Sequence, residues 1–241
     1  MPAVLVHGVP DTQHLWDSVR AKLRRQDVVA LSLPGFGAPL PAGFDATVRS
    51  YLDWLTREIG RFGEPVDLVG HDWGAVFALL VAGLRPGLVR TLACGGAAID
   101  PEYRWHAVAR AWRTPVVGEA FMALATPARL ESGMIRHGIP AAAAREQARH
   151  FDRTMKRCIL RLYRSARGSG TDWNAVVEHI DRPALVIWGE DDPFVDPRFG
   201  RRLAERLHAD LHVFPHCGHW WPLQRPAETA AALEHFWTRS A

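Results

Sequence analysis

Short apolar runs alternate along most of the chain with longer stretches in which apolar residues recur every three or four positions. The short runs have the length of strands, whereas the longer stretches carry the period of a helix with one apolar face. This alternation predicts a mostly parallel sheet covered by helices on both faces, and right-handed crossovers make it doubly wound. The predicted strands cover 3–6, 27–33, 66–70, 89–96, 184–189 and 210–215.

The alternation of strands and helices stops between residues 101 and 180, where no convincing strand occurs and helical segments follow one another. We therefore expect residues 1–100 and 181–241 to form an α/β core of about six strands, with residues 101–180 as an all-helical cap. The helices predicted for the core cover 13–25, 46–60, 74–85, 197–208 and 226–238. Those predicted for the cap cover 103–113, 115–125, 141–164 and 172–179.

The third predicted strand ends in the segment GHDWG, residues 70–74, and a helical pattern begins at once. Glycine at both ends of such a pentapeptide is typical of the sharp strand-to-helix turn that usually holds a catalytic serine. Here the central residue is Asp72. Carboxylate attack on an ester or amide would yield a mixed anhydride. A carboxylate suits displacement at a saturated carbon that carries a leaving group, with an alkyl ester as the covalent intermediate.

Two other polar groups follow predicted strands at the same edge of the sheet, where ligands of parallel sheets bind. Asp192 follows the strand at 184–189, and His219 follows the strand at 210–215. The chain order of nucleophile, acid and histidine is the order of the α/β-hydrolase fold. The sequence therefore predicts that Asp72, Asp192 and His219 lie together.

Five short motifs, each weak alone, together resemble the α/β-hydrolase family, and more narrowly its epoxide hydrolase and haloalkane dehalogenase branch. The resemblance extends over nearly the whole chain. It implies that Asp72 is the nucleophile, that His219 activates the water that cleaves the ester, and that Asp192 holds the imidazole. The motifs are HGVPD (7–11), LPGFG (33–37), GHDWG (70–74), GEDDP (189–193) and GHWW (218–221).

The same resemblance implies an oxyanion hole made of two backbone N–H groups, one after the nucleophile and one in the His-Gly loop. In this chain these groups belong to Trp73 and Val9. They would stabilise the oxyanion that forms on Asp72 during ester hydrolysis. His7 and His71 are expected to orient or pack against neighbouring groups rather than to react.

The acid of this site has alternatives, because Glu190 and Asp191 stand directly before Asp192. The usual Gly-x-x-Asp spacing from Gly189 favours Asp192. A related subgroup carries its acid after the preceding strand, where Asp100 is the nearest carboxylate, but Asp100 comes several residues too late.

The leaving group distinguishes the two activities of this branch. An epoxide needs a proton donor at its ring oxygen, and Tyr163 in LRLYRSA resembles the Tyr-Arg element of epoxide hydrolases. The second cap tyrosine of those enzymes has no obvious counterpart, because Tyr103 comes early in the cap. A halide needs N–H donors, and Trp73 with either Trp105 or Trp112 would supply two indoles.

We therefore expect an epoxide hydrolase, with a haloalkane dehalogenase as the alternative and a binding protein with a spent active site as a third possibility. The substrate is expected to be small and apolar, and the reaction requires no metal or organic cofactor. The pocket between cap and sheet is expected to be aromatic. Its predicted residues are Trp73, Trp105, Trp112, Phe121, Met122, Phe151 and Trp220.

Composition narrows the functional class further. The net charge is only +3 and the arginines are scattered, which argues against nucleic-acid binding. The three cysteines form no disulfide framework or Cys-x-x-Cys metal motif, and they favour a reducing, cytoplasmic setting. The sequence displays no signal-peptide pattern and no apolar run that approaches the ~20 residues of a membrane span.

Compared with the family's usual fold, the sequence begins at what is normally the third strand. Either the start is truncated or the protein manages without the first two strands. The strand at 27–33 then becomes an edge with unpaired backbone groups, which invites pairing with another chain. We expect this edge to be buried in a homodimer or covered by another segment. The alternative is a monomer whose edge is blunted by Arg24, Arg25 and Asp27.

Overall fold

The computed structural model describes residues 1–166 and 169–240, so residues 167 and 168 of the predicted cap and residue 241 lie outside it. Six parallel strands form one sheet in the order β2-β1-β3-β4-β5-β6. This order confirms the predicted α/β-hydrolase fold and its six strands. The strands are β1 (Ala3–Val6), β2 (Val28–Leu31), β3 (Val66–His71), β4 (Val89–Gly95), β5 (Ala184–Gly189) and β6 (Asp210–Phe214).

Helices cover both faces of the sheet, and each face carries its own apolar cluster. The helix that follows β3 is buried along ten consecutive residues, because it lies between the sheet and other helices and is apolar on all sides. One face carries α1 (Asp17–Arg20), α11 (Trp221–Gln224) and α12 (Pro226–Arg239). The other carries α2 (Val48–Gly60), α3 (Trp73–Leu84), α9 (Ser169–Val177) and α10 (Pro197–Leu207).

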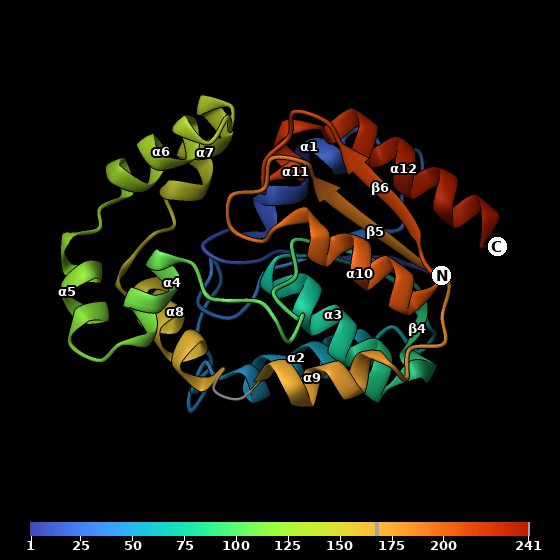
Figure 1. Ribbon diagram of the computed structural model, residues 1–241, viewed down its shortest axis with the longest axis horizontal. Helices are drawn as coiled ribbons and strands as arrows, with labels where there is room; N and C mark the ends of the chain where they lie inside the picture. The colour runs from blue at the N-terminus through green and yellow to red at the C-terminus, as the bar shows by residue number, and fades with distance from the viewer. Residues whose placement is uncertain (167–168, 241) are drawn as a thin grey trace.

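Five helices between β4 and β5 gather beyond the carboxyl ends of the strands, at the left of Figure 1. The sixth helix of this segment, α9, packs instead against α3, where Val176 lies against Gly83. The five are α4 (Ala107–Arg113), α5 (Val117–Leu124), α6 (Pro127–Arg136), α7 (Ala141–Ala148) and α8 (Arg153–Ser165).

Two details of this helical segment differ from the sequence prediction. Helix α6 was not predicted, although Thr126 caps it by accepting a hydrogen bond from the Arg129 backbone N–H and Pro127 occupies its first position. The single helix predicted at 141–164 is two helices. Helix α8 starts anew after Asp152, because the Asp152 carboxylate caps it by accepting a hydrogen bond from the Met155 backbone N–H at 2.8 Å.

Strand β2 lies at the edge of the sheet, as predicted, and pairs only with β1 among the described residues. Val29 at its centre is 36% exposed. Its burial in a homodimer remains a prediction. No helix in residues 1–166 and 169–240 combines the length and apolar character needed to cross a membrane.

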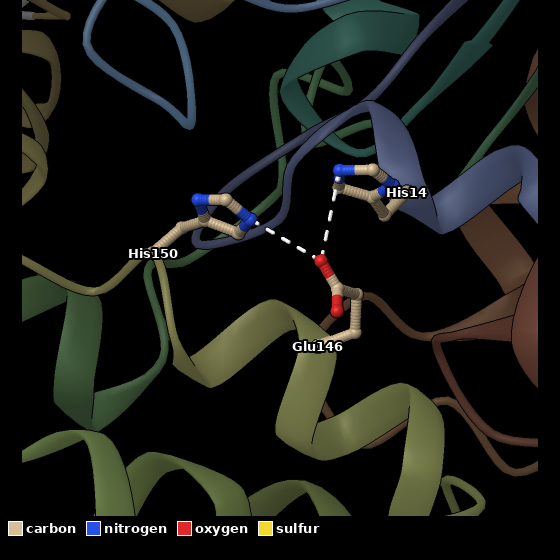
Figure 2. Close-up of side chains that lie close together, drawn as sticks. All are labelled: His14, Glu146 and His150. Atoms are coloured by element: carbon tan, nitrogen blue, oxygen red, sulfur yellow. Dashed lines mark hydrogen bonds and ion pairs between the residues drawn. The ribbon is translucent and has the colours of Figure 1, made fainter.

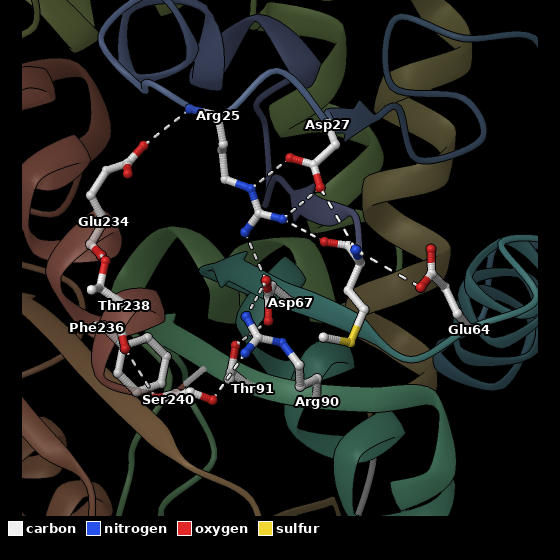
Figure 3. Close-up of polar contacts among 11 residues, drawn as sticks. Arg25, Asp27, Glu64, Asp67, Arg90, Thr91, Glu234, Phe236, Thr238 and Ser240 are labelled. Carbon is white, nitrogen blue, oxygen red and sulfur yellow. Dashed lines mark hydrogen bonds and ion pairs between the residues drawn. The ribbon is translucent and has the colours of Figure 1, made fainter.

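A buried carboxylate holds together the end of the sheet that lies opposite Asp72 (Figure 3). Asp67 on β3 is fully buried and accepts hydrogen bonds from Arg25, Arg90 and Thr91, each at 2.7 Å. Because Arg25 also pairs with Asp27 at 2.8 Å, the network joins the loop before edge strand β2 to the centre of the sheet. A buried carboxylate without such partners would strongly destabilise the fold.

Candidate active site

Asp72 occupies a sharp turn between β3 and α3, with φ of 52° and ψ of −121°. A residue with a side chain rarely adopts this backbone, and the strain is on the order of 1–3 kcal/mol. Backbone hydrogen bonds hold the turn. The Asp72 N–H donates to Gly95 O at 2.9 Å, and Asp72 O accepts from Ala75 and Val76 at 3.0 and 3.1 Å.

Both ends of the pentapeptide require glycine, because neighbouring backbone leaves no room for a side chain on either side of the turn. A side chain on Gly74 would overlap the Val6 carbonyl group of β1. A side chain on Gly70 would overlap the Gly74 carbonyl group and the Ala75 backbone in the first turn of α3. The close packing aims the Asp72 side chain at the carboxyl edge of the sheet.

The structure brings the three predicted catalytic residues together. His219 and Asp192 share a hydrogen bond of 2.7 Å between Nδ1 and Oδ2, while His219 Nε2 faces Asp72 Oδ1 at 3.9 Å. The other Asp192 oxygen accepts hydrogen bonds from the Phe194 and Val195 backbone N–H groups at 2.8 and 3.0 Å. Asp192 therefore lies where it can fix the orientation of the imidazole.

The competing carboxylates lie elsewhere. Glu190 and Asp191 are exposed. Asp100 caps the turn after β4 by accepting a hydrogen bond from the Glu102 backbone N–H at 2.8 Å, and it lies 3.6 Å from Arg202. Among the four carboxylates considered, the described contacts join only Asp192 to His219.

The predicted oxyanion-hole groups contact the Asp72 carboxylate. The Val9 backbone N–H donates to Asp72 Oδ2 at 2.7 Å, and the Trp73 backbone N–H lies near enough to lower the pKa of this carboxyl group. The loop that carries Val9 is anchored by His7, whose Nε2 accepts a hydrogen bond from the Leu33 backbone N–H at 3.0 Å. His7 therefore orients the loop, as expected. A side chain on Gly8 would overlap the Asp72 carboxylate.

Burial and neighbouring charges set the protonation states. Burial raises the pKa of Asp72, against the opposing effects of His219 and the Val9 N–H. Burial alone would lower the pKa of His219, but the carboxylates of Asp192, Asp72 and Asp11 outweigh it and raise the pKa to about 9. The His219 imidazole is therefore protonated at neutral pH in the resting protein.

Asp11 is a member of this site that sequence reasoning missed. Its carboxyl group is fully buried, and burial together with the Asp72 charge raises its pKa to about 7. The Trp220 indole N–H donates to both of its oxygens, at 3.0 and 3.2 Å. His71 Nδ1 lies 3.9 Å from Asp11, and His71 Nε2 donates to the His219 carbonyl oxygen at 2.9 Å. The only signal in the sequence was an acidic residue at the end of the HGVPD motif.

We expect the pKa of the His219 imidazole to be about 9. The NMR chemical shift of its Cε1–H group as a function of pH would measure this value. In Asp72→Asn the pKa should fall by about one unit or more, because the removed negative charge is one of those that favour the imidazolium. Asp191→Asn changes an exposed carboxylate of the same loop as Asp192 and should leave the pKa near 9. An unchanged pKa in Asp72→Asn would contradict this account of the electrostatics.

A cavity of about 520 Å³ lies above Asp72 and His219 and is walled by residues of the helical segment and the core. Six of the predicted aromatic residues line it. Met122, the seventh predicted residue, does not line it. It follows Phe121 on α5, so its side chain points about 100° away from that of Phe121 around the helix axis. Met122 is 5% exposed. The six residues are Trp73, Trp105, Trp112, Phe121, Phe151 and Trp220.

Two tyrosines line this cavity, one predicted and one not. Tyr163 on α8 packs edge-on against the Trp73 ring, with the ring centroids 5.3 Å apart. Tyr103 lies in the loop before α4 and packs against Trp105 at 5.3 Å. The third tyrosine, Tyr51, donates to Pro34 O at 2.8 Å in the core, where it was expected to pack.

The negative charge of Asp72 acts on both cavity tyrosines. Burial raises the pKa of Tyr163 well above its usual value, and the negative charge of Asp72 raises it further. The same two causes, in the same order, raise the pKa of Tyr103. Tyr103 and Tyr163 are therefore protonated O–H donors at the same cavity as the carboxylate.

Comparison with known proteins identifies the family. A sequence model described as the alpha/beta hydrolase family matches residues 3–232. The chain belongs to the alpha/beta hydrolase family. This alpha/beta hydrolase is 26% identical over 239 residues to an (E)-2-((N-methylformamido)methylene)succinate hydrolase from Acinetobacter baylyi, with 97% of this chain and 89% of that protein covered.

Other relatives extend the range of named activities. The hydrolase is 28% identical over 229 residues to the dihydrolipoyllysine-residue acetyltransferase component of the acetoin cleaving system from Pseudomonas putida, with 90% of this chain covered. It spans only 58% of the length of that protein. A haloalkane dehalogenase from Bradyrhizobium elkani has the same fold, with a TM-score of 0.75 and 22% identity over 99% of this chain and 91% of that one.

Proposed function

We propose that this alpha/beta hydrolase opens an epoxide with water through a covalent ester of Asp72. One observation carries the proposal: a buried carboxylate, held by the Val9 backbone N–H, shares a cavity with two tyrosine side chains. A carboxylate attacks saturated carbon and a phenol protonates an alkoxide, so the two features together match an epoxide.

In the first step, Asp72 attacks a ring carbon of the epoxide. The Val9 N–H occupies Oδ2, so Oδ1 is the oxygen free to form the new C–O bond. The C–O bond of the ring breaks, and the ring oxygen takes a proton from Tyr163 or Tyr103. Because the ester removes the negative charge of Asp72, one cause of their raised pKa disappears as the alkoxide forms. The tyrosines therefore become stronger acids when a proton is required.

In the second step, water cleaves the ester at the Asp72 carboxyl carbon. Loss of the Asp72 charge also lowers the pKa of His219, which returns its proton through solvent to the tyrosinate and becomes a general base. The imidazole then takes a proton from the attacking water, and the Val9 and Trp73 N–H groups hold the oxyanion. Collapse expels the product alkoxide, which takes a proton from His219. Asp72 is then a carboxylic acid that carries the second proton of the attacking water, and it passes this proton to His219. The diol leaves, and the ionised Asp72 and the protonated His219 are restored.

Dehalogenation is the second candidate, and one observation favours it. The Trp112 indole N–H is buried and has no hydrogen-bond partner among the described residues, so a shift of this ring would offer a donor to a halide. Against this reading, the two cavity tyrosines supply the proton donor that an epoxide needs and a halide does not. A spent binding protein is disfavoured by the intact hydrogen bonds among the acid, the histidine and the oxyanion-hole groups.

A panel of terminal and aryl epoxides, run beside alkyl bromides and chlorides of similar size, tests the proposal. We expect vicinal diols from the epoxides by mass spectrometry and no halide ion above the rate of an Asp72→Ala control. Halide release that depends on Asp72, with no diol from any epoxide, would establish the dehalogenase instead. Inertness toward both panels would contradict the proposed chemistry.

A further inference from the structure

A second cluster of chemically reactive side chains lies outside the cavity, where the helical segment meets the core (Figure 2). His14 belongs to the short 3₁₀ helix η1 (Gln13–Trp16), Glu146 to α7, and His150 follows α7 directly. Within the described part of the chain, these three residues form the one group of histidine, cysteine and acidic side chains close enough to hold a metal ion. They are partly exposed, so an ion from solvent can reach them.

The geometry converges on one carboxylate oxygen. Glu146 Oε1 lies 3.6 Å from His14 Nε2 and 3.3 Å from His150 Nε2. Ligand atoms bound at 2.0–2.1 Å to a tetrahedral zinc ion lie about 3.3 Å apart, so these two separations match the edges of a zinc site. The third edge, between the histidines, closes with a small movement, because all three ligand atoms already lie within 4.8 Å of one another.

A second observation concerns the groups behind the ligands. Asp17 Oδ2 lies 2.7 Å from His14 Nδ1, so this carboxylate accepts the Nδ1 proton and leaves Nε2 with its lone pair toward Glu146. Metal-binding histidines characteristically donate their second nitrogen to a carboxylate in this way. Arg149 donates to Glu146 Oε2 at 3.0 Å, which leaves Oε1 as the oxygen for an ion. The arrangement thus orients two ligands as well as gathering three.

We propose that His14, Glu146 and His150 bind a divalent transition-metal ion of the zinc type, with solvent at the remaining position. Two imidazoles and one carboxylate are a donor set that zinc binds. The site is separate from the proposed active site, because none of its three residues lines the cavity.

The ion would fasten the helical segment to the loop that forms the oxyanion hole. The neighbouring residue of α7, Gln147, already accepts hydrogen bonds from Thr12, at 2.8 Å from the backbone N–H and 3.0 Å from the hydroxyl group. Thr12 caps η1 and lies between Val9 and His14 in the same loop. Binding at the three ligands would therefore stabilise the docked position of α7 and the placement of the Val9 N–H.

Zinc chloride and cobalt chloride, added separately to chelator-treated full-length protein, test the site. We expect one zinc ion per chain by calorimetry and elemental analysis, and visible cobalt absorption bands typical of a tetrahedral site with nitrogen and oxygen ligands. Zinc at a hundredfold excess over its Kd should raise the Tm by about 5 °C or more. Asp17→Asn should weaken zinc binding ~10-fold, the usual effect of losing the carboxylate behind a ligand.

His14→Ala and His150→Ala should each abolish the Tm increase and the cobalt bands. His235→Ala removes an exposed histidine of α12 and should preserve both. If His14→Ala does not fold, His150→Gln gives the same test at the end of α7. Binding that survives in the His150 variants, or the absence of stoichiometric binding by the wild-type protein, would overturn the proposal.

Discussion

His219→Gln is expected to stop turnover on an epoxide while leaving one substrate mass attached to Asp72. The variant retains the carboxylate and its hydrogen bond from Val9, so attack on the ring carbon can still occur. It lacks the base that activates water, so the ester cannot be cleaved. Removal of a residue of a catalytic triad lowers turnover by roughly 10⁴-fold or more. Intact-protein mass spectrometry would detect the adduct, and peptide mapping would locate it.

Two control variants and one labelling experiment complete this test. Asp72→Ala should be equally inactive but should form no adduct, because the nucleophile is absent. His216→Gln changes an exposed histidine of the same loop and should retain turnover. A single turnover of the wild-type protein in ¹⁸O-labelled water should place the label in Asp72 rather than in the diol, since water attacks the carboxyl carbon. Label that enters the diol directly would refute the covalent mechanism.

Tyr163→Phe is expected to lower turnover on epoxides by ~10²-fold or more, the usual effect of losing a positioned acid. Tyr103→Phe should also lower turnover, because both tyrosines line the cavity and the charge of Asp72 acts on both. Rates of diol formation at saturating substrate would measure the effect.

Tyr51→Phe is the matched control, because this tyrosine donates to Pro34 O in the core and does not line the cavity. Its turnover should remain close to that of the wild type even if its Tm falls. Circular dichroism would establish that the Tyr163 variant is folded. Unchanged epoxide kinetics in both cavity variants, together with bromide release by the wild type, would favour the dehalogenase.

The sheet and the placement of the three catalytic candidates could be predicted from the sequence for a simple physical reason. Buried parallel strands are short apolar runs, and their carboxyl ends must meet at one edge. Asp72, Asp192 and His219 each lie within five residues of the end of a strand, so their proximity depended only on the topology. The glycines beside Asp72 marked the turn because only glycine fits that close approach.

What the sequence did not predict depends on side-chain direction and on contacts between distant segments. Tyr103 was set aside because it comes early in the cap, at the start of a helix predicted over 103–113. It lies instead in the loop before α4, where no period indicates which way a side chain points. Asp11 was missed because its burial requires Trp220, more than two hundred residues away, as a donor. The break between α7 and α8 was missed because Asp152 lies within a helical pattern that continues on both sides.

The strained backbone of Asp72 places a carboxylate at the active site at a cost in folding stability. Glycine adopts a positive φ without steric cost, so a sequence selected for stability alone would carry glycine at this corner of the fold. Glycine has no carboxylate, and an enzyme with glycine there could not form the proposed ester. Selection for turnover therefore retains a residue that the folded state disfavours, and the rest of the molecule must supply the compensating stability.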